Sequence, residues 1–256
     1  MKNITINESN YIKFDDTEWN SRVLGYETNE IYEIQFDSDD NGEKLFNTFE
    51  SYCFENKIKY TSLRINPNSR IKKQLLENFG YINVETSILA ESNFKKIKEN
   101  KILEKFDFNL REFQDSDIDN LKLISSTQFN HGRFFEDPMI SPDVAKLRNS
   151  NWIDDLSKKS KILVGEKDNV IFGFMAFKND EPYSSLELGG VNFVYSYLAY
   201  SFWYRVFEYL KNKNIKSVRA MISAHNLNVI NLYSYFGFKF TNSYIGYRKI
   251  RDKDVF

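Results

Sequence analysis

The segment from Asn214 to Phe238 constrains the fold more than any other part of the chain. Apolar residues alternate between Val218 and Ile222, as they do in a strand with one buried face. After Asn226 the apolar spacing becomes helical, and Gly237 follows where a helix needs a left-handed residue at its C-terminal end. The segment therefore predicts a strand, a turn, a short helix and a second strand, which is a unit of an α/β protein.

Six residues of this segment match, in register, the N-x-x-A-x-x-L-Y-x-x-x-G-F signature of the GNAT acyltransferases, with valine in place of alanine: Asn226, Val229, Leu232, Tyr233, Gly237 and Phe238. The chain therefore resembles this family over roughly residues 106–250. The resemblance implies a GNAT fold, in which a mixed central sheet is flanked by helices. It also implies acetyl-CoA as the co-substrate.

Composition argues against several other classes of protein. The 256 residues are 41% hydrophobic, which is enough to bury one large or two small cores. The net charge is −1 with acids and bases interspersed, so we expect no nucleic-acid or membrane partner. The single cysteine, Cys53, and two histidines predict neither disulfides nor a metal site. The polar N-terminus and the lack of a membrane-spanning apolar run predict a cytoplasmic protein.

The two halves of the chain resemble each other. Ile58–Tyr81 aligns with Ile215–Phe238 without a gap at an offset of 157 residues, although any strand–helix–glycine–strand unit would look similar. We favour a duplication, with a smaller, partial GNAT-like α/β domain over 1–104 and the acyltransferase domain over 105–256. The first copy has Ser69 where the second has Asn226, and Leu76 in place of Tyr233. Only the C-terminal half is therefore expected to bind acetyl-CoA.

The resemblance places the donor where two neighbouring parallel strands separate. The pantetheine amides would pair with the open strand edge, and the pyrophosphate would lie at the N-terminus of the next helix. The family's Q/R-x-x-G-x-G/A loop corresponds to residues 196–201, which contain no glycine. We expect Ser196, Ala199, Ser201 and, on the preceding strand, Val191 to bind the cofactor. The alternative is that this segment is an ordinary helix start.

Three residues are candidates for the chemistry. In enzymes of this kind the tyrosine that matches Tyr233 protonates the departing thiolate, although Tyr233 could also be one more aromatic residue on a buried helix face. Asn226 would cap its helix and could also contact the cofactor. Glu187 lies on the strand before the loop, where a buried carboxylate would have a raised pKa and could act as a base. The alternative for Glu187 is a position that faces solvent.

The segment Phe129–Ile140 resembles the G-R-F-x-x-D-P-x-I element of sugar-nucleotide N-acetyltransferases similar to dTDP-fucosamine acetyltransferase. Trp19–Gly25 resembles that group's N-terminal W-D-S-x-x-x-G element, with asparagine for aspartate. We expect His131, Arg133 and Asp137 to bind the acceptor. The alternative is a loop held by an internal Arg133–Asp137 pair.

The sequence thus predicts an N-acetyltransferase that moves an acetyl group from acetyl-CoA to the amine of a small substrate. A nucleotide-linked amino sugar is the favoured acceptor by resemblance, which would connect the protein to polysaccharide biosynthesis. A homodimer is compatible with this interpretation. One alternative is a degenerate GNAT-fold protein that acts as a binding module, because the loop lacks glycine. Another is a GNAT enzyme with an amino-acid or peptide amine as acceptor.

Overall fold

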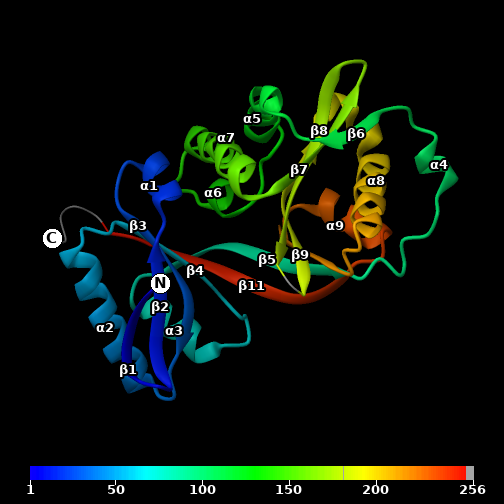
Figure 1. The fold of residues 1–256 in the computed structure, drawn as a ribbon. Helices are drawn as coiled ribbons and strands as arrows, with labels where there is room; N and C mark the ends of the chain where they lie inside the picture. The colour runs from blue at the N-terminus through cyan, green and yellow to red at the C-terminus, as the bar shows by residue number, and fades with distance from the viewer. Residues whose placement is uncertain (181, 252–256) are drawn as a thin grey trace. The chain divides into compact units, whose positions relative to one another are not determined.

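The computed structural model describes residues 1–180 and 182–251, and these form two compact units (Figure 1). Unit 1 contains Met1–Ser87, Glu136–Met139 and the C-terminal segment from Ser243, and unit 2 contains Ile88–Phe135 and Ile140–Asn242. The predicted domains 1–104 and 105–256 stay a prediction, because compactness does not show which segments fold independently. No helix among the described residues has the length and apolar character needed to cross a membrane.

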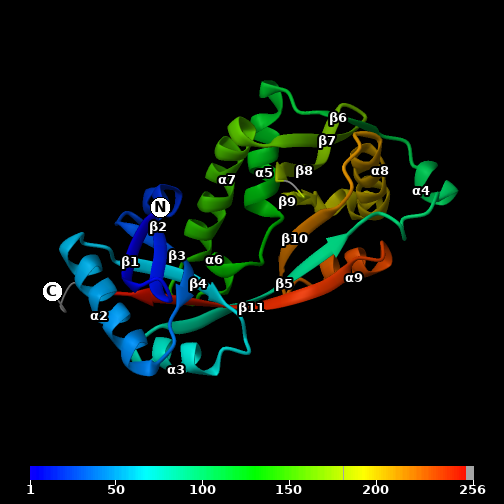
Figure 2. The ribbon, with the colours of Figure 1, turned by 60° about the horizontal axis from the view of Figure 1, so that its bottom comes forward.

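Unit 1 is built on a mixed sheet. Its elements are β1 (Lys2–Asn7), β2 (Asn10–Asp16), α1 (Glu18–Leu24), β3 (Thr28–Gln35), α2 (Asp39–Glu55), β4 (Tyr60–Ile65), α3 (Arg70–Asn78) and the first part of β5 (Ile82–Ser92). Strands β1 to β3 pair antiparallel, β3 and β4 pair parallel, and the end of β11 (Lys239–Ile250) pairs antiparallel with β4. Apolar residues of α2 and α3 pack on the strands in one core, and both helices lie on the same side of them (Figure 2).

Unit 2 is also built on a mixed sheet, in the order β10-β9-β8-β7-β6. Its elements are α4 (Lys101–Glu104), β6 (Asn109–Glu112), η1 (Asp115–Asp117), α5 (Ile118–Thr127), α6 (Arg133–Glu136, which crosses into unit 1), α7 (Pro142–Lys159), β7 (Lys161–Lys167), β8 (Val170–Asp180), β9 (Tyr183–Val191), η2 (Phe193–Leu198), α8 (Ala199–Asn212), β10 (Val218–Ser223) and α9 (Leu227–Tyr235).

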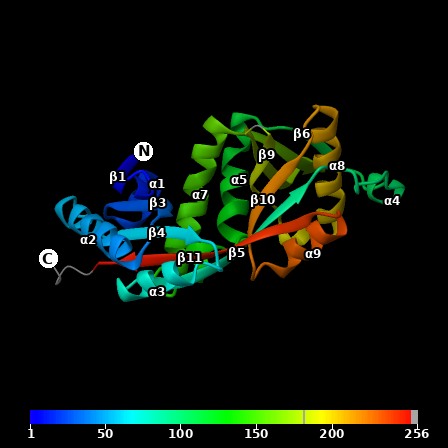
Figure 3. The same ribbon diagram turned by 90° about the horizontal axis from the view of Figure 1, so that it is seen from below.

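Successive side chains of β7 and β8 point to opposite faces of the sheet, so unit 2 has a hydrophobic core on each face. Ile162 and Phe174 pack with α5 and α7, whereas Leu163 and Met175 pack with α8 and α9. Figure 3 shows the two helix pairs on opposite sides of β9 and β10. The predicted α/β fold with a mixed sheet flanked by helices is confirmed.

The predicted internal repeat is present in the backbone of the two units. Helices α3 and α9 each span nine residues at the predicted offset of 157. Each is followed by a glycine with positive φ, 77° at Gly80 and 72° at Gly237. The residue after each glycine closes the helix in the same way, because the Tyr81 N–H donates to the Leu76 carbonyl and the Phe238 N–H donates to the Tyr233 carbonyl.

Candidate active site

Strands β9 and β10 separate part of the way along their length. Their parallel pairing ends at Leu186 and Ala220, although β9 continues to Val191 and β10 continues to Ser223. Beyond that point β9 keeps its partner β8, with which it pairs as far as Gly173 and Val191. Among the described residues, the β9 edge over 187–191 therefore has no strand partner on the β10 side. This open edge and β10 form what we call the donor cleft.

The donor cleft opens at a β-bulge. Ala176 of β8 pairs with Leu188 and Phe177 pairs with Leu186, so Glu187 of β9 lies opposite no residue. A bulge bends its strand and redirects a side chain, which explains why β9 leaves β10 at this point. Glu187 is half-buried, and its Oε2 accepts a hydrogen bond from the Ser160 hydroxyl at the end of α7. The candidate base therefore lies where the cleft begins.

Tyr233 lies on α9 inside the core of unit 2 and is 4% exposed. Its ring stacks on that of Phe238, with 4.5 Å between centroids and 13° between planes. Burial raises the pKa of Tyr233 to about 12. The nearby Trp203 indole opposes this shift, but its Nε1 does not meet hydrogen-bond geometry, so the contact is a loose electrostatic one. Tyr233 thus holds its proton at neutral pH, and its role as an acid stays a prediction.

Asn226 begins α9 as predicted. Its side-chain oxygen accepts a hydrogen bond from the Val229 N–H at 3.3 Å, which confirms the helix cap. The corresponding Ser69 in unit 1 makes no such bond to α3. Whether Asn226 also contacts a cofactor stays a prediction.

Residues 196–201 are helical, because η2 runs directly into α8. The first three amides of this helical segment donate to acceptors within the protein. The Phe193 N–H donates to Gln128 Oε1 at 2.9 Å, the Val194 N–H donates to Asn192 Oδ1 at 3.0 Å, and the Tyr195 N–H donates to the Asn192 carbonyl at 2.9 Å. These amides are therefore not free to bind a diphosphate.

The four residues expected to bind the cofactor lie on three elements, β9, η2 and α8. Val191 ends the open edge of β9, Ser196 lies in η2, and Ala199 begins α8 with its N–H donated to the Ser196 carbonyl. Ser201 is buried in α8, where its hydroxyl donates to the Leu103 carbonyl. The strand edge fits a pantetheine arm, but the helix start does not fit a diphosphate. Cofactor contacts by these residues stay a prediction.

Unit 1 contains a second separation of parallel strands at the corresponding place. The pairing of β3 with β4 ends at Ile31 and Leu63. The next residue, Tyr32, lies opposite no residue of β2, because Phe14 pairs with Ile31 and Lys13 pairs with Glu33. Unit 1 therefore repeats the bulge and the separation, with Tyr32 in the place of Glu187.

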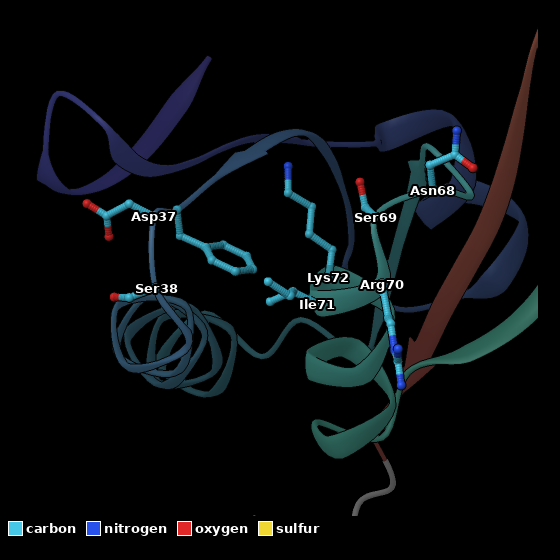
Figure 4. A pocket seen from close by; sticks show the side chains of 8 residues that line it. Asp37, Ser38, Asn68, Ser69, Arg70, Ile71 and Lys72 are labelled. Atoms are coloured by element: carbon cyan, nitrogen blue, oxygen red, sulfur yellow. The ribbon is translucent and has the colours of Figure 1, made fainter.

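The separation in unit 1 has different chemistry from the donor cleft. A pocket of about 330 Å³ lies between the starts of α2 and α3, lined by 36–38 and 68–72 (Figure 4). Lys72 Nζ donates to the carbonyl of Ile34, which lies on β3 beyond the end of its pairing with β4, at 2.5 Å. Burial lowers the pKa of Lys72.

The start of α2 carries Asp37, Asp39 and Asp40. Hydrogen bonds from Asn41 and Asn10 lower the pKa of Asp37, so its carboxylate is ionised at neutral pH. These acids would repel a diphosphate at this helix start. The separation in unit 1 therefore lacks the features that would favour a CoA donor.

Three solved structures share this architecture. A functionally unknown conserved protein from Staphylococcus epidermidis is 13% identical, with 98% of this chain and 94% of that chain covered and a TM-score of 0.68. A GCN5-related N-acetyltransferase from Sphaerobacter thermophilus is 13% identical, with 94% and 76% covered and a TM-score of 0.65. A tandem GNAT protein from the clavulanic acid biosynthesis pathway is 8% identical, with 87% and 75% covered and a TM-score of 0.59.

The fold is a GNAT fold. At these identities the likeness shows the fold alone. No protein-family model matches the chain, and no curated protein is similar to it in sequence. The resemblance to the sugar-nucleotide acetyltransferases is therefore not confirmed.

The residues expected to bind the acceptor are divided between the two units of this GNAT fold. Half-buried His131 and buried Arg133 belong to unit 2, and Asp137 belongs to unit 1. The Asp137 carboxylate is 1% exposed and accepts two hydrogen bonds from Arg248, Nε to Oδ2 at 2.9 Å and Nη2 to Oδ1 at 3.2 Å. The sequence analysis missed this pair. Acceptor binding by the three residues stays a prediction.

Proposed function

We propose that the protein transfers an acetyl group from a pantetheine thioester to the amine of a small substrate, with acetyl-CoA as the donor that a GNAT fold implies. The observation that carries this proposal is the open edge of β9 over 187–191, which begins at the bulged Glu187. Backbone N–H and C=O groups along such an edge can pair with the two amides of a pantetheine arm, as an added strand would.

The reaction forms one C–N bond and breaks one C–S bond. The amine nitrogen attacks the thioester carbonyl, the nitrogen loses a proton, and the departing thiolate gains one. Glu187, whose carboxylate accepts a hydrogen bond from the Ser160 hydroxyl, is the candidate acceptor of the amine proton, directly or through a water. Tyr233, whose phenol is protonated at neutral pH, is the candidate donor of a proton to the thiolate.

The acceptor that we favour is a nucleotide-linked amino sugar, on the resemblance of residues 129–140 and 19–25 to that group of enzymes. An amino-acid or peptide amine is the alternative acceptor. A panel of the three amine classes, each assayed for donor-dependent release of free thiol, distinguishes them. Turnover of only amino acids or peptides would exclude the sugar acceptor.

A second candidate function is a GNAT-fold binding module without acyl transfer, which the occupied amides of Phe193, Val194 and Tyr195 favour. Calorimetry with acetyl-CoA and with acetyl-pantetheine separates the two functions. We expect a single site per chain for at least one thioester, and weaker binding when Gly189→Pro disrupts the β9 edge. Absence of binding by both thioesters, together with no release of free thiol from any acyl donor tested, would contradict the enzyme and support the module.

A further inference from the structure

The start of the α8 segment presents apolar side chains where a CoA diphosphate would leave the donor cleft. Phe193 is 80% exposed, Val194 is 72% exposed and Tyr197 is 57% exposed. Because the first amides of the segment are already hydrogen-bonded, a diphosphate here would lose water and gain few donors in return. This surface fits a protein partner better than it fits a nucleotide.

The apolar surface continues toward the C-terminal end of α9. Tyr200 lies one turn after Tyr197 and packs edge-on against Tyr235, with 5.0 Å between ring centroids. The Tyr235 hydroxyl accepts a hydrogen bond from Asn100 Nδ2 at 3.0 Å. These contacts connect the apolar residues to segment 95–105, which passes over α8 and α9.

Segment 95–105 is rich in exposed lysines, with two glutamates among them. It lies against α9, because a Cβ placed on Gly237 would be 2.6 Å from Lys96 Cβ. Its five lysines outnumber its two glutamates, so the segment carries a net positive charge. These lysines and the exposed apolar residues form what we call the donor-side patch: Lys95, Lys96, Lys98, Lys101, Lys105, Phe193, Val194, Tyr197, Tyr200 and Tyr235.

We propose that the acyl donor is a thioester on the phosphopantetheine arm of an acidic carrier protein, which docks on the donor-side patch while its arm enters the donor cleft. This inference rests on the proposed function, a pantetheine thioester as acyl donor, and replaces acetyl-CoA with a carrier-bound thioester as that donor. An apolar centre bordered by charge is the anatomy of a protein interface, and the lysines match an acidic partner. Such a donor carries no nucleotide diphosphate, so it does not need the amides that the structure occupies.

The test measures binding, so it needs no knowledge of the acceptor. The full chain is titrated with an acidic acyl carrier protein in its holo form, with the same carrier lacking the arm, and with CoA. We expect the holo carrier to bind at least about tenfold more tightly than CoA and than the armless carrier, since only the holo carrier uses both patch and cleft. Binding of the holo carrier should weaken as the salt concentration rises, because docking on the lysines depends on charge.

Two variants locate the binding. Lys95→Glu with Lys96→Glu and Lys98→Glu should weaken holo-carrier binding by about tenfold or more. The same variant should leave the binding of acetyl-pantetheine, which carries no phosphate, unchanged within about twofold. The matched control reverses the charge of Lys158 and Lys159, which are exposed at the end of α7. It should leave the binding of both ligands unchanged. Phe193→Ser should also weaken the binding of the holo carrier and leave the binding of CoA unchanged.

CoA binding as tight as that of the holo carrier would overturn the carrier proposal and leave the proposed function intact. Equal binding of the holo and armless carriers would also overturn it, because no arm would enter the cleft. So would lysine-dependent sedimentation with phosphatidylglycerol vesicles in the absence of carrier binding, which would assign the patch to a membrane surface. Failure of CoA, acetyl-pantetheine and the holo carrier alike would instead remove the proposed function.

Discussion

Replacing Tyr233 with phenylalanine separates a chemical role of the phenol from a packing role. The ring and its stacking on Phe238 are kept, and only the hydroxyl is lost. Its polar neighbour is the Trp203 indole, whose Nε1 does not reach hydrogen-bond geometry, so removal of the hydroxyl should change the free energy of unfolding by less than about 1 kcal/mol at neutral pH. In a chain of this size that corresponds to a shift in Tm of less than about 4 °C.

The pKa of Tyr233, about 12 against a usual value near 10, gives the variant a second signature. A folded-state pKa above the unfolded value stabilises the protein below about pH 10, and this stabilisation is lost as the pH rises through about 12. The shift corresponds to about 3 kcal/mol. The free energy of unfolding of wild type, relative to that of Tyr233→Phe, should therefore fall by up to that amount between about pH 9 and pH 12, so the variant becomes the more stable protein; urea unfolding measures this.

If Tyr233 is the general acid, turnover should fall by about 10²–10⁴ in Tyr233→Phe, with donor affinity unchanged. The matched control is Tyr204→Phe on α8, whose hydroxyl donates to Glu104 at 2.7 Å. That variant should lose about 1 kcal/mol of stability and keep its turnover. Turnover of Tyr233→Phe within about threefold of wild type would refute the acid role and leave Tyr233 with a packing role alone.

Three further substitutions test single interactions. Glu187→Gln should lower turnover at saturating donor by about 10² or more, and a thiol-release rate equal to wild type would exclude Glu187 as the base. Asp137→Asn should reduce the free energy of unfolding by about 3–5 kcal/mol in urea, because Arg248 is left charged and buried without its partner; a loss below about 1 kcal/mol would contradict this. Asn226→Ala should cost about 1 kcal/mol through the lost cap, and a simultaneous tenfold loss of donor affinity by calorimetry would show that Asn226 also contacts the donor.

The sequence predicts those parts of the fold that depend on neighbours along the chain. Helix α9 was predictable because its cap, its apolar spacing and Gly237 all lie within a dozen residues. The repeat was predictable for the same reason, because both copies keep these local signals. The position of Glu187 on the strand that precedes residues 196–201 followed from the resemblance to GNAT enzymes.

The missed features depend on pairing between distant segments. The bulge at Glu187 is a property of the register between β8 and β9, and no local signal in β9 specifies it. The Arg248 partner of Asp137 is 111 residues away. The helix that replaces the expected loop did have a signal, since Asn192 before an apolar run is a typical N-cap. An ordinary helix start was the alternative to the phosphate-binding loop for residues 196–201, and the structure has this helix.

The central claim is that the acyl donor lies along the open edge of β9 and that unit 1 binds none. Amide hydrogen exchange with and without saturating acetyl-pantetheine or acetyl-CoA tests it directly, since both separations are read in one experiment. We predict slower amide exchange over 187–191. We predict no change in amide exchange over 32–35, where Lys72 already donates a hydrogen bond to the Ile34 carbonyl. Unchanged exchange over 187–191, or equal protection of both segments, would contradict the account.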